Sequence, residues 1–198
     1  MKNKLVSKNK DFTLLARDCV GGILYHQLGL RFLSPTINLY FTQKDFNYFC
    51  LYLKEYIDTE LTECVDEDIE YPVGILVPVN GLKPIKVRFL HYASFDEAKK
   101  KWDERKSRIN WDNIFVVSTF CYTGETQNFS QELVEQWDQI KYKKVMIVNQ
   151  KYGFDNEFII NKPEDCEEYA WLLVDDINNP ELKVFNKFDF VKFLNSKK

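Results

Sequence analysis

The chain has 198 residues, of which 45% are hydrophobic and 29% are charged, and its formal net charge is −3. This length predicts one domain over residues 1–198, and the small net charge argues against a nucleic-acid partner. No apolar run approaches the roughly 20 residues of a transmembrane helix, and no apolar segment follows the first lysines as it would in a signal peptide. The five cysteines show no CxxC spacing, which favours neither a disulfide framework nor a zinc site. We therefore expect a cytoplasmic protein without a bound metal.

The first third of the chain predicts one buried strand and two helices. Residues 11–16 form a short apolar run typical of a strand, and Gly21 and Gly22 then allow a sharp turn. Residues 23–33 follow a helical pattern weakened by Gly29 and ended by Pro35. A clearer helix is expected over residues 45–57, with Asp45 as its cap. The acidic stretch 60–70 is interpreted as a solvated loop.

The rest of the chain alternates between strand and helix patterns. Residues 71–92 predict two strands around Asn80-Gly81, a dipeptide favoured in tight hairpins. Ser94 and Glu97 form a capping box that begins a helix over 94–109. The later elements are a strand at 113–118, a helix at 130–140, a strand at 144–149, an ambiguous run at 171–174 and a closing helix at 188–194. This order predicts an α/β fold with three α/β/α layers and a mixed, mostly parallel sheet, flavodoxin-like in outline.

Ligands of open α/β sheets bind at the carboxyl ends of the strands. The loops expected at those ends are residues 17–22, 91–94, 119–129 and 149–153. If the strands are parallel, these loops share one edge of the sheet. Cys19 and His91 would then face the same cleft although they are 72 positions apart.

Cys19 has two interpretations. At a helix N-terminus the helix dipole would lower the pKa of its thiol and favour the thiolate, and the amides of Val20, Gly21 and Gly22 could hold an oxyanion. Alternatively, Cys19 is a small buried hydrophobic residue, as most free cysteines are. The sequence leaves both readings open.

Other polar residues complete the predicted site. His91 is the candidate general base, because an ordinary imidazole titrates near neutral pH. His26 is more consistent with a structural role, although it could orient the Cys19 loop. Arg105 and Arg108 are candidates for a phosphate contact, with Arg105 alternatively lying along the core. Asp18 fits a cap or turn residue beside Cys19.

Four segments of the sequence can be compared with known families: "DCVGGILYHQLGLRFLSPTINLYF", "YPVGIL", "LHYASFDEAKKKWDERKSRINWDNIFV" and "FDFVKFLN". Together they resemble an uncharacterised bacterial family that is often labelled exopolysaccharide biosynthesis proteins. The resemblance spans about residues 12–195 and implies a role in making polysaccharides. In that family Asn-Asn commonly precedes the cysteine, whereas Arg17 and Asp18 stand there in this chain. The cysteine loop is also similar to the Gly-Asn-Cys-Gln loop of a capsule acetyltransferase that uses coenzyme A.

These observations lead to two main hypotheses. The first is an acyltransferase that acts on a sugar or glycan precursor, with no tightly bound cofactor and with coenzyme A as a candidate acyl donor. The alternative is a non-catalytic protein that binds a glycan or nucleotide sugar within a polysaccharide assembly pathway. A glycosyltransferase ranks below both, because the sequence lacks the paired aspartates that often hold a metal-bound nucleotide sugar.

Overall fold

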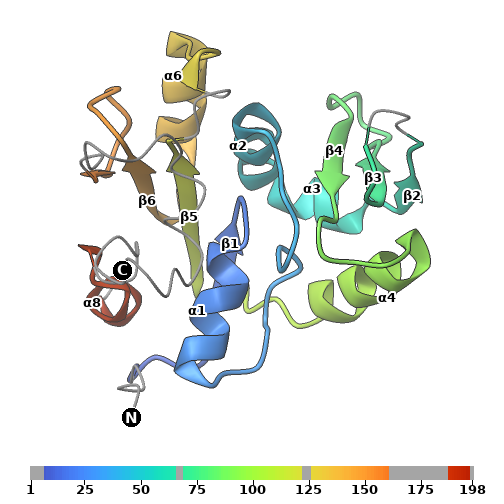
Figure 1. The fold of residues 1–198 in the computed structure, drawn as a ribbon, viewed down its shortest axis with the longest axis horizontal. Helices are drawn as coiled ribbons and strands as arrows, with labels where there is room; N and C mark the ends of the chain where they lie inside the picture. The colour runs from blue at the N-terminus through green and yellow to red at the C-terminus, as the bar shows by residue number, and fades with distance from the viewer. Residues whose placement is uncertain (1–6, 66–68, 122–125, 161–186, 197–198) are drawn as a thin grey trace.

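The strands form two separate sheets in the computed structural model, which describes residues 7–65, 69–121, 126–160 and 187–196. The parallel sheet has the order β1 (Thr13–Ala16), β5 (Ile114–Phe120), β6 (Lys143–Val148) and β7 (Glu157–Ile159). The antiparallel sheet has the order β2 (Leu61–Glu63), β3 (Val73–Leu76) and β4 (Ile85–Arg88). Figure 1 shows the antiparallel sheet on the right of the molecule and the parallel sheet further left. The predicted α/β class is confirmed.

The prediction of a single mixed sheet needs correction, and burial explains why. Every residue of β1 and β5 is buried, as expected for strands covered on both faces. In β4, by contrast, Ile85 and Val87 are buried while Lys86 and Arg88 are only half-buried. This alternation suits an antiparallel sheet with one buried face, so the Asn80-Gly81 hairpin forms its own sheet with β2.

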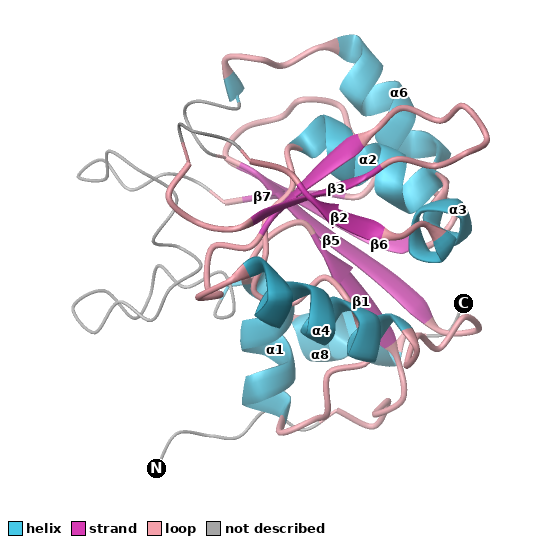
Figure 2. Cartoon of the chain, turned by 90° about the vertical axis from the view of Figure 1, so that its right-hand side faces the viewer, coloured by secondary structure: helices cyan, strands magenta, loops and turns pink. Residues whose placement is uncertain are grey.

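Helices cover both faces of the parallel sheet, as Figure 2 shows. On one face, α1 (Val20–Leu28) and α8 (Phe190–Asn195) pack against side chains such as Leu14. On the other face, α2 (Gln43–Leu51) and α6 (Gln131–Gln139) share a core with Leu15. The same core continues to α3 (Leu53–Asp58), α4 (Phe95–Lys106) and the buried face of the antiparallel sheet. The predicted three layers are therefore present around the parallel sheet.

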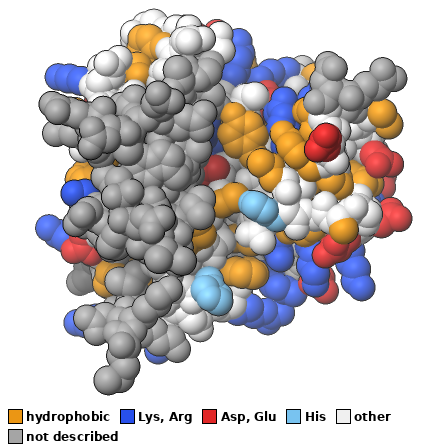
Figure 3. All heavy atoms as spheres, viewed as in Figure 1, with side chains coloured by type: hydrophobic (Ala, Val, Ile, Leu, Met, Phe, Trp, Pro, Cys, Tyr) orange, Lys and Arg blue, Asp and Glu red, His pale blue; other side chains and the backbone are white. Residues whose placement is uncertain are grey.

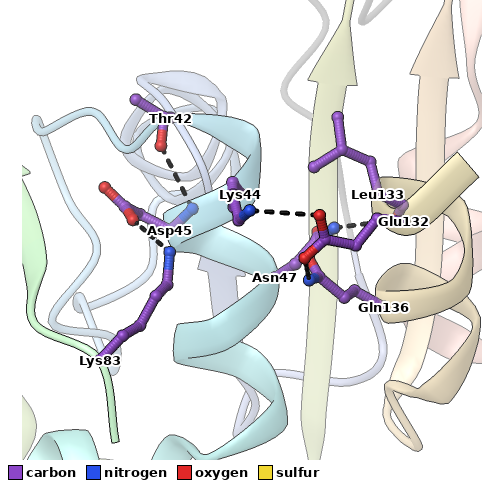
Figure 4. A network of polar contacts seen from close by, with 8 residues as sticks. All are labelled: Thr42, Lys44, Asp45, Asn47, Lys83, Glu132, Leu133 and Gln136. Atoms are coloured by element: carbon purple, nitrogen blue, oxygen red, sulfur yellow. Dashed lines mark hydrogen bonds and ion pairs between the residues drawn. The ribbon is translucent and has the colours of Figure 1, made fainter. Parts of the chain in front are cut away.

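The polar contacts between α2 and α6 lie both in the core and at the surface (Figure 4). The buried Asn47 amide donates from Nδ2 to the carbonyl oxygen of Leu133 at 3.0 Å. At the surface, the Lys44 Nζ lies 3.2 Å from Glu132 Oε2, and about half of each side chain is exposed. The Ser118 hydroxyl also donates to Gln43 Oε1 at 2.7 Å, which ties α2 to β5.

Several helix boundaries differ from the predicted ones. The helix expected at 23–33 begins at Val20 and ends before Gly29, whose φ of 65° is left-handed. Gly21 and Gly22 therefore lie inside the helix rather than in a sharp turn. The helix expected at 45–57 is divided at Tyr52, and its first part is capped by Thr42, whose hydroxyl accepts from the Asp45 amide at 3.2 Å.

Three further predictions concern the helix after the hairpin, the acidic stretch and the tail. The helix after the hairpin is confirmed, because the Ser94 hydroxyl accepts from the Glu97 amide at 3.3 Å at the start of α4. The acidic stretch is not wholly a loop, since it contains β2. The closing helix is confirmed as α8, while residues 171–174 and part of the 119–129 loop lie outside the described residues. Within the described part of the chain, no helix has both the length and the apolar character needed to cross a membrane.

Candidate functional site

Cys19 lies between the end of β1 and the start of α1. Its backbone is already helical, with φ −66° and ψ −12°, and its side chain is half-buried. The Asp18 carboxylate accepts from the Val20 amide through Oδ1 at 3.0 Å. Because Asp18 rather than Cys19 caps this amide, the thiol is left to face other groups.

His91 supplies the group that meets the thiol. Cys19 Sγ and His91 Nε2 lie 3.1 Å apart, which is within hydrogen-bonding distance for sulfur. His91 is exposed and lies in the loop between β4 and α4. The structure thus brings together the two residues that the sequence analysis assigned to one cleft.

The predicted reason for this contact is wrong, however. His91 follows a strand of the antiparallel sheet, so the shared edge of a parallel sheet cannot explain its position. The segment between α1 and α2, residues 29–42, joins the two sheets instead, and we call it the connecting segment. Tyr40 pairs with Arg88 through backbone bonds of 2.7 and 3.0 Å, and the Phe41 amide donates to the Arg17 carbonyl at 3.0 Å. This segment holds the end of β1 beside the end of β4.

The protonation state of Cys19 also differs from the prediction. Burial, and after it the negative charge of Asp18, raises the pKa of the Cys19 thiol from 9.0 to about 12. The predicted lowering of this pKa is therefore wrong. Cys19 is therefore a neutral thiol at pH 7, and it can donate a hydrogen bond to His91 in the tautomer that leaves Nε2 without a proton.

A buried network lies behind the thiol. The Thr119 hydroxyl donates to Asp18 Oδ2 and accepts from Arg17 Nη2 at 3.1 Å. Arg17 Nη2 also lies 3.5 Å from Asp18 Oδ2, and neither side chain is more than 7% exposed. This network fixes the loop that carries Cys19. It also corrects the role of Val20, whose amide is bound by Asp18 and is not available to an oxyanion.

Comparison with known proteins now places the chain. Residues 1–195 match a family described as a domain of unknown function, DUF1919. The chain belongs to the DUF1919 family. An uncharacterised protein of Haemophilus influenzae is 29% identical to it over 189 residues, which cover 94% of this chain and 85% of that protein. The predicted membership of an uncharacterised family is thereby confirmed.

The two glycines after Cys19 in this DUF1919 protein are explained by packing. A Cβ atom at Gly21 would lie 2.8 Å from the Cβ of Ala16, and one at Gly22 would lie 2.6 Å from Asn38 Oδ1. Real Cβ atoms do not approach other atoms so closely, so these positions let α1 lie against β1 and the connecting segment. Their amides are in the first turn of α1, where a helix offers no acceptor of its own.

The two predicted phosphate ligands of the DUF1919 chain have protein partners. Arg105 is buried and donates from Nη1 to the Tyr92 hydroxyl at 2.6 Å and to the Ile37 carbonyl at 3.4 Å. Its guanidinium also lies 5.2 Å from the centre of the Phe32 ring. Arg105 therefore ties α4 to the connecting segment, and Arg108 pairs with Glu104 at 3.4 Å.

His26 does not approach the Cys19 loop. It is exposed in the last turn of α1, while Cys19 precedes the first turn. Figure 3 shows the side chains of the two histidines apart on the same face of the molecule. The hypothesis that His26 orients the loop is therefore wrong, and its exposure makes it a useful control residue.

The sequence analysis gave no role in the site to four residues near the Cys19 loop of the DUF1919 protein: Arg17, Tyr40, Arg88 and Thr119. Arg17 and Arg88 have their guanidinium groups 5.2 and 5.9 Å from the centre of the Tyr40 ring. The alternation of polar and apolar residues in β4 gave a signal for Arg88, because it marks this arginine as facing away from the core. No comparable pattern in the sequence links Thr119 to Asp18.

Two other features of the described residues do not contribute to this site. A hollow of about 420 Å³ is lined by residues of α3 and β2 and by residues 59–60 and 77–80, and neither Cys19 nor His91 is among them. The described residues also contain no group of three or more His, Cys, Asp or Glu side chains placed to hold a metal ion.

Proposed function

We propose that this protein is an acyltransferase in which Cys19 is the nucleophile and His91 is the general base. The observation that carries the proposal is the 3.1 Å contact between Sγ and Nε2 of residues 72 positions apart. A nucleophile and a base within hydrogen-bonding reach are the minimum arrangement for covalent acyl transfer. The resemblance to exopolysaccharide biosynthesis proteins supports a sugar or glycan precursor as the acceptor.

The proposed reaction has two halves. In the first, His91 Nε2 takes the thiol proton while Sγ attacks the carbonyl carbon of an acyl thioester, for which coenzyme A is the candidate carrier. The carrier thiolate leaves and takes the proton from His91, so that Cys19 holds the acyl group. In the second half, a sugar hydroxyl gives its proton to His91 and attacks the acyl carbon. Sγ then leaves and recovers the proton.

The raised pKa of Cys19 explains why a general base, His91, is needed. A neutral thiol is a weak nucleophile, so its proton must move to Nε2 as the bond from sulfur to carbon forms. General base catalysis of this kind contributes about 10²–10⁴-fold. The amides of Gly21 and Gly22 remain the proposed donors to the oxyanion, because Val20 is bound by Asp18.

The test is the rate at which iodoacetamide alkylates Cys19 at pH 7.5, followed by mass spectrometry of the peptide that contains it. We expect His91→Ala to slow this alkylation at least tenfold, whereas the matched control His26→Ala leaves the rate unchanged. Equal rates in the wild type and in His91→Ala would overturn the proposed dyad. A second measurement, acylation of Cys19 by acetyl-coenzyme A, tests the donor, and it should disappear in Cys19→Ala.

The half-buried, neutral state of Cys19 favours a second candidate, a non-catalytic protein that binds a glycan or nucleotide sugar. In that case Cys19 is a structural residue, and it reacts with iodoacetamide only after denaturation. The aromatic side chains Phe129 and Tyr152, whose ring centres are 5.0 Å apart, offer a surface on which a sugar ring could stack. Both candidates place the protein in the cytoplasm, which the free thiols of Cys19, Cys50, Cys64 and Cys121 support.

A further inference from the structure

Arg88 differs from Arg105 and Arg108 in how its guanidinium is held. Its Nη1 is buried and has no hydrogen-bond partner among the described residues. Arg105 and Arg108, by contrast, donate to protein oxygens. A guanidinium presents five donors, and buried donors in native proteins are nearly always paired. The unpaired Nη1 therefore calls for a partner that the described residues do not supply.

Arg88 lies near the candidate site, so a ligand that binds its Nη1 would also lie near that site. Arg88 and Tyr40 are bridge partners on neighbouring extended segments, so their side chains leave the same face. Val87 and Phe89 point into the core, and Arg88 therefore points away from it, with part of its side chain exposed. It is three residues before His91. The guanidinium of Arg17, two residues before Cys19, lies 5.2 Å from the centre of the same Tyr40 ring.

The charges of this region leave one positive charge without a counterion. Arg17 lies 3.5 Å from Asp18 Oδ2, so these two charges offset each other. No carboxylate of the described residues lies within ion-pair distance of Arg88. Its guanidinium is positioned by the Tyr40 ring, 5.9 Å away, rather than by hydrogen bonds, so it can rotate to meet a ligand.

We propose that Arg88, beside Tyr40, binds an oxyanion of the molecule whose reacting group lies at Cys19 and His91. A phosphate or carboxylate accepts two parallel hydrogen bonds from a guanidinium, and such a contact supplies a partner to Nη1. The inference rests on the proposed function only for the place of the reacting group. It gives the substrate a chemical class, a molecule that carries an anionic group near the carbon attacked by sulfur.

The test is the thermal unfolding of the full chain in rising concentrations of sodium phosphate, sodium acetate or sodium chloride at equal ionic strength. A ligand that binds the native state raises Tm, and we expect a rise of about 3–6 °C when the anion is tenfold above its Kd. The acetate and phosphate series distinguish a carboxylate from a phosphate. The chloride series accounts for screening.

Two variants assign the effect to one side chain. Arg88→Met is expected to weaken anion binding at least tenfold. The matched control Arg108→Met removes the same charge from an arginine paired with Glu104, and it should leave the Kd unchanged. Phosphate also stabilises proteins by exclusion from their surface, so only the difference between these variants counts. Equal Kd values in the wild type and Arg88→Met, or no rise above chloride with either anion, overturn the inference.

Two further variants keep the test decisive. If Arg88→Met does not fold, Arg88→Lys replaces it, since lysine keeps the charge but not the two-pronged donor geometry. A Kd within twofold of the wild-type value in Arg88→Lys would then overturn the inference. Cys19→Ala should retain anion binding, which separates this inference from the proposed chemistry. The Cys19–His91 dyad can fail its alkylation test while Arg88 passes this one, and the reverse also holds.

Discussion

The neutral state of Cys19 leads to a prediction about its reactivity in the His91→Ala variant. Raising the pKa of a thiol from 9.0 to about 12 lowers its thiolate population about a thousandfold below pH 9. Each thiolate is more nucleophilic, however, by about 15–30-fold for this increase in pKa. We therefore expect Cys19 of His91→Ala to react with a neutral disulfide about 30–60-fold more slowly than an ordinary thiol.

The assay is the pH dependence of disulfide exchange at Cys19, followed by peptide mass spectrometry with glutathione as the reference thiol. The rate in His91→Ala should rise about tenfold per pH unit to above pH 10, whereas the reference levels off near pH 9. Adding Asp18→Asn should lower the pKa of Cys19 only part of the way, because burial is the larger cause. A plateau between pH 8 and 9 in His91→Ala would refute the reasoning.

Two predictions concern stability, each measured by urea unfolding. Gly21→Ala should lower the free energy of unfolding by about 1–3 kcal/mol. The new Cβ would lie 2.8 Å from the Cβ of Ala16, which can move only with its strand. A stability equal to that of the wild type would show that α1 is not closely packed against β1 at this position. Asn47→Ala should cost about 1–3 kcal/mol because it removes a buried amide between α2 and α6. Lys44→Ala at the same interface should cost less than about 1 kcal/mol, since its ion pair with Glu132 is half exposed; a larger loss for Lys44→Ala than for Asn47→Ala would contradict this account.

Local signals were sufficient for most elements of the fold. The capping box at Ser94 and Glu97 and the apolar run around Val116 each act within a few residues, so the pattern identifies them directly. The two strands expected around Asn80-Gly81 are present, but Leu76 pairs with Ile85, so residues 77–84 connect them in place of a tight turn. The break at Tyr52 was not predicted, because the apolar spacing continues through it. The break is seen only in the backbone of Tyr52, whose φ of −120° and ψ of 43° are not helical.

In the candidate site, too, local patterns predicted some features and the packing of the chain decided others. Residue type and the predicted topology together made Cys19 and His91 a candidate pair, because a thiol and an imidazole at one edge of a sheet suit acyl transfer. Their 3.1 Å contact depends on Tyr40 pairing with Arg88, a contact between segments 48 positions apart that no local pattern records. The pKa of the thiol likewise depends on burial and on Asp18, so the surroundings of Cys19 decided that this pKa is raised and not lowered.

The sequence by itself determined most of the strands and helices and which side chains can carry chemistry, because backbone preference and side-chain type are local properties. The tertiary structure decided that the hairpin forms a second sheet, that Arg105 is a structural residue and that the Cys19 thiol is neutral. Each of these outcomes depends on which groups lie near one another in space. Proximity in a folded chain follows from the packing of the whole core, and distance along the sequence does not encode it.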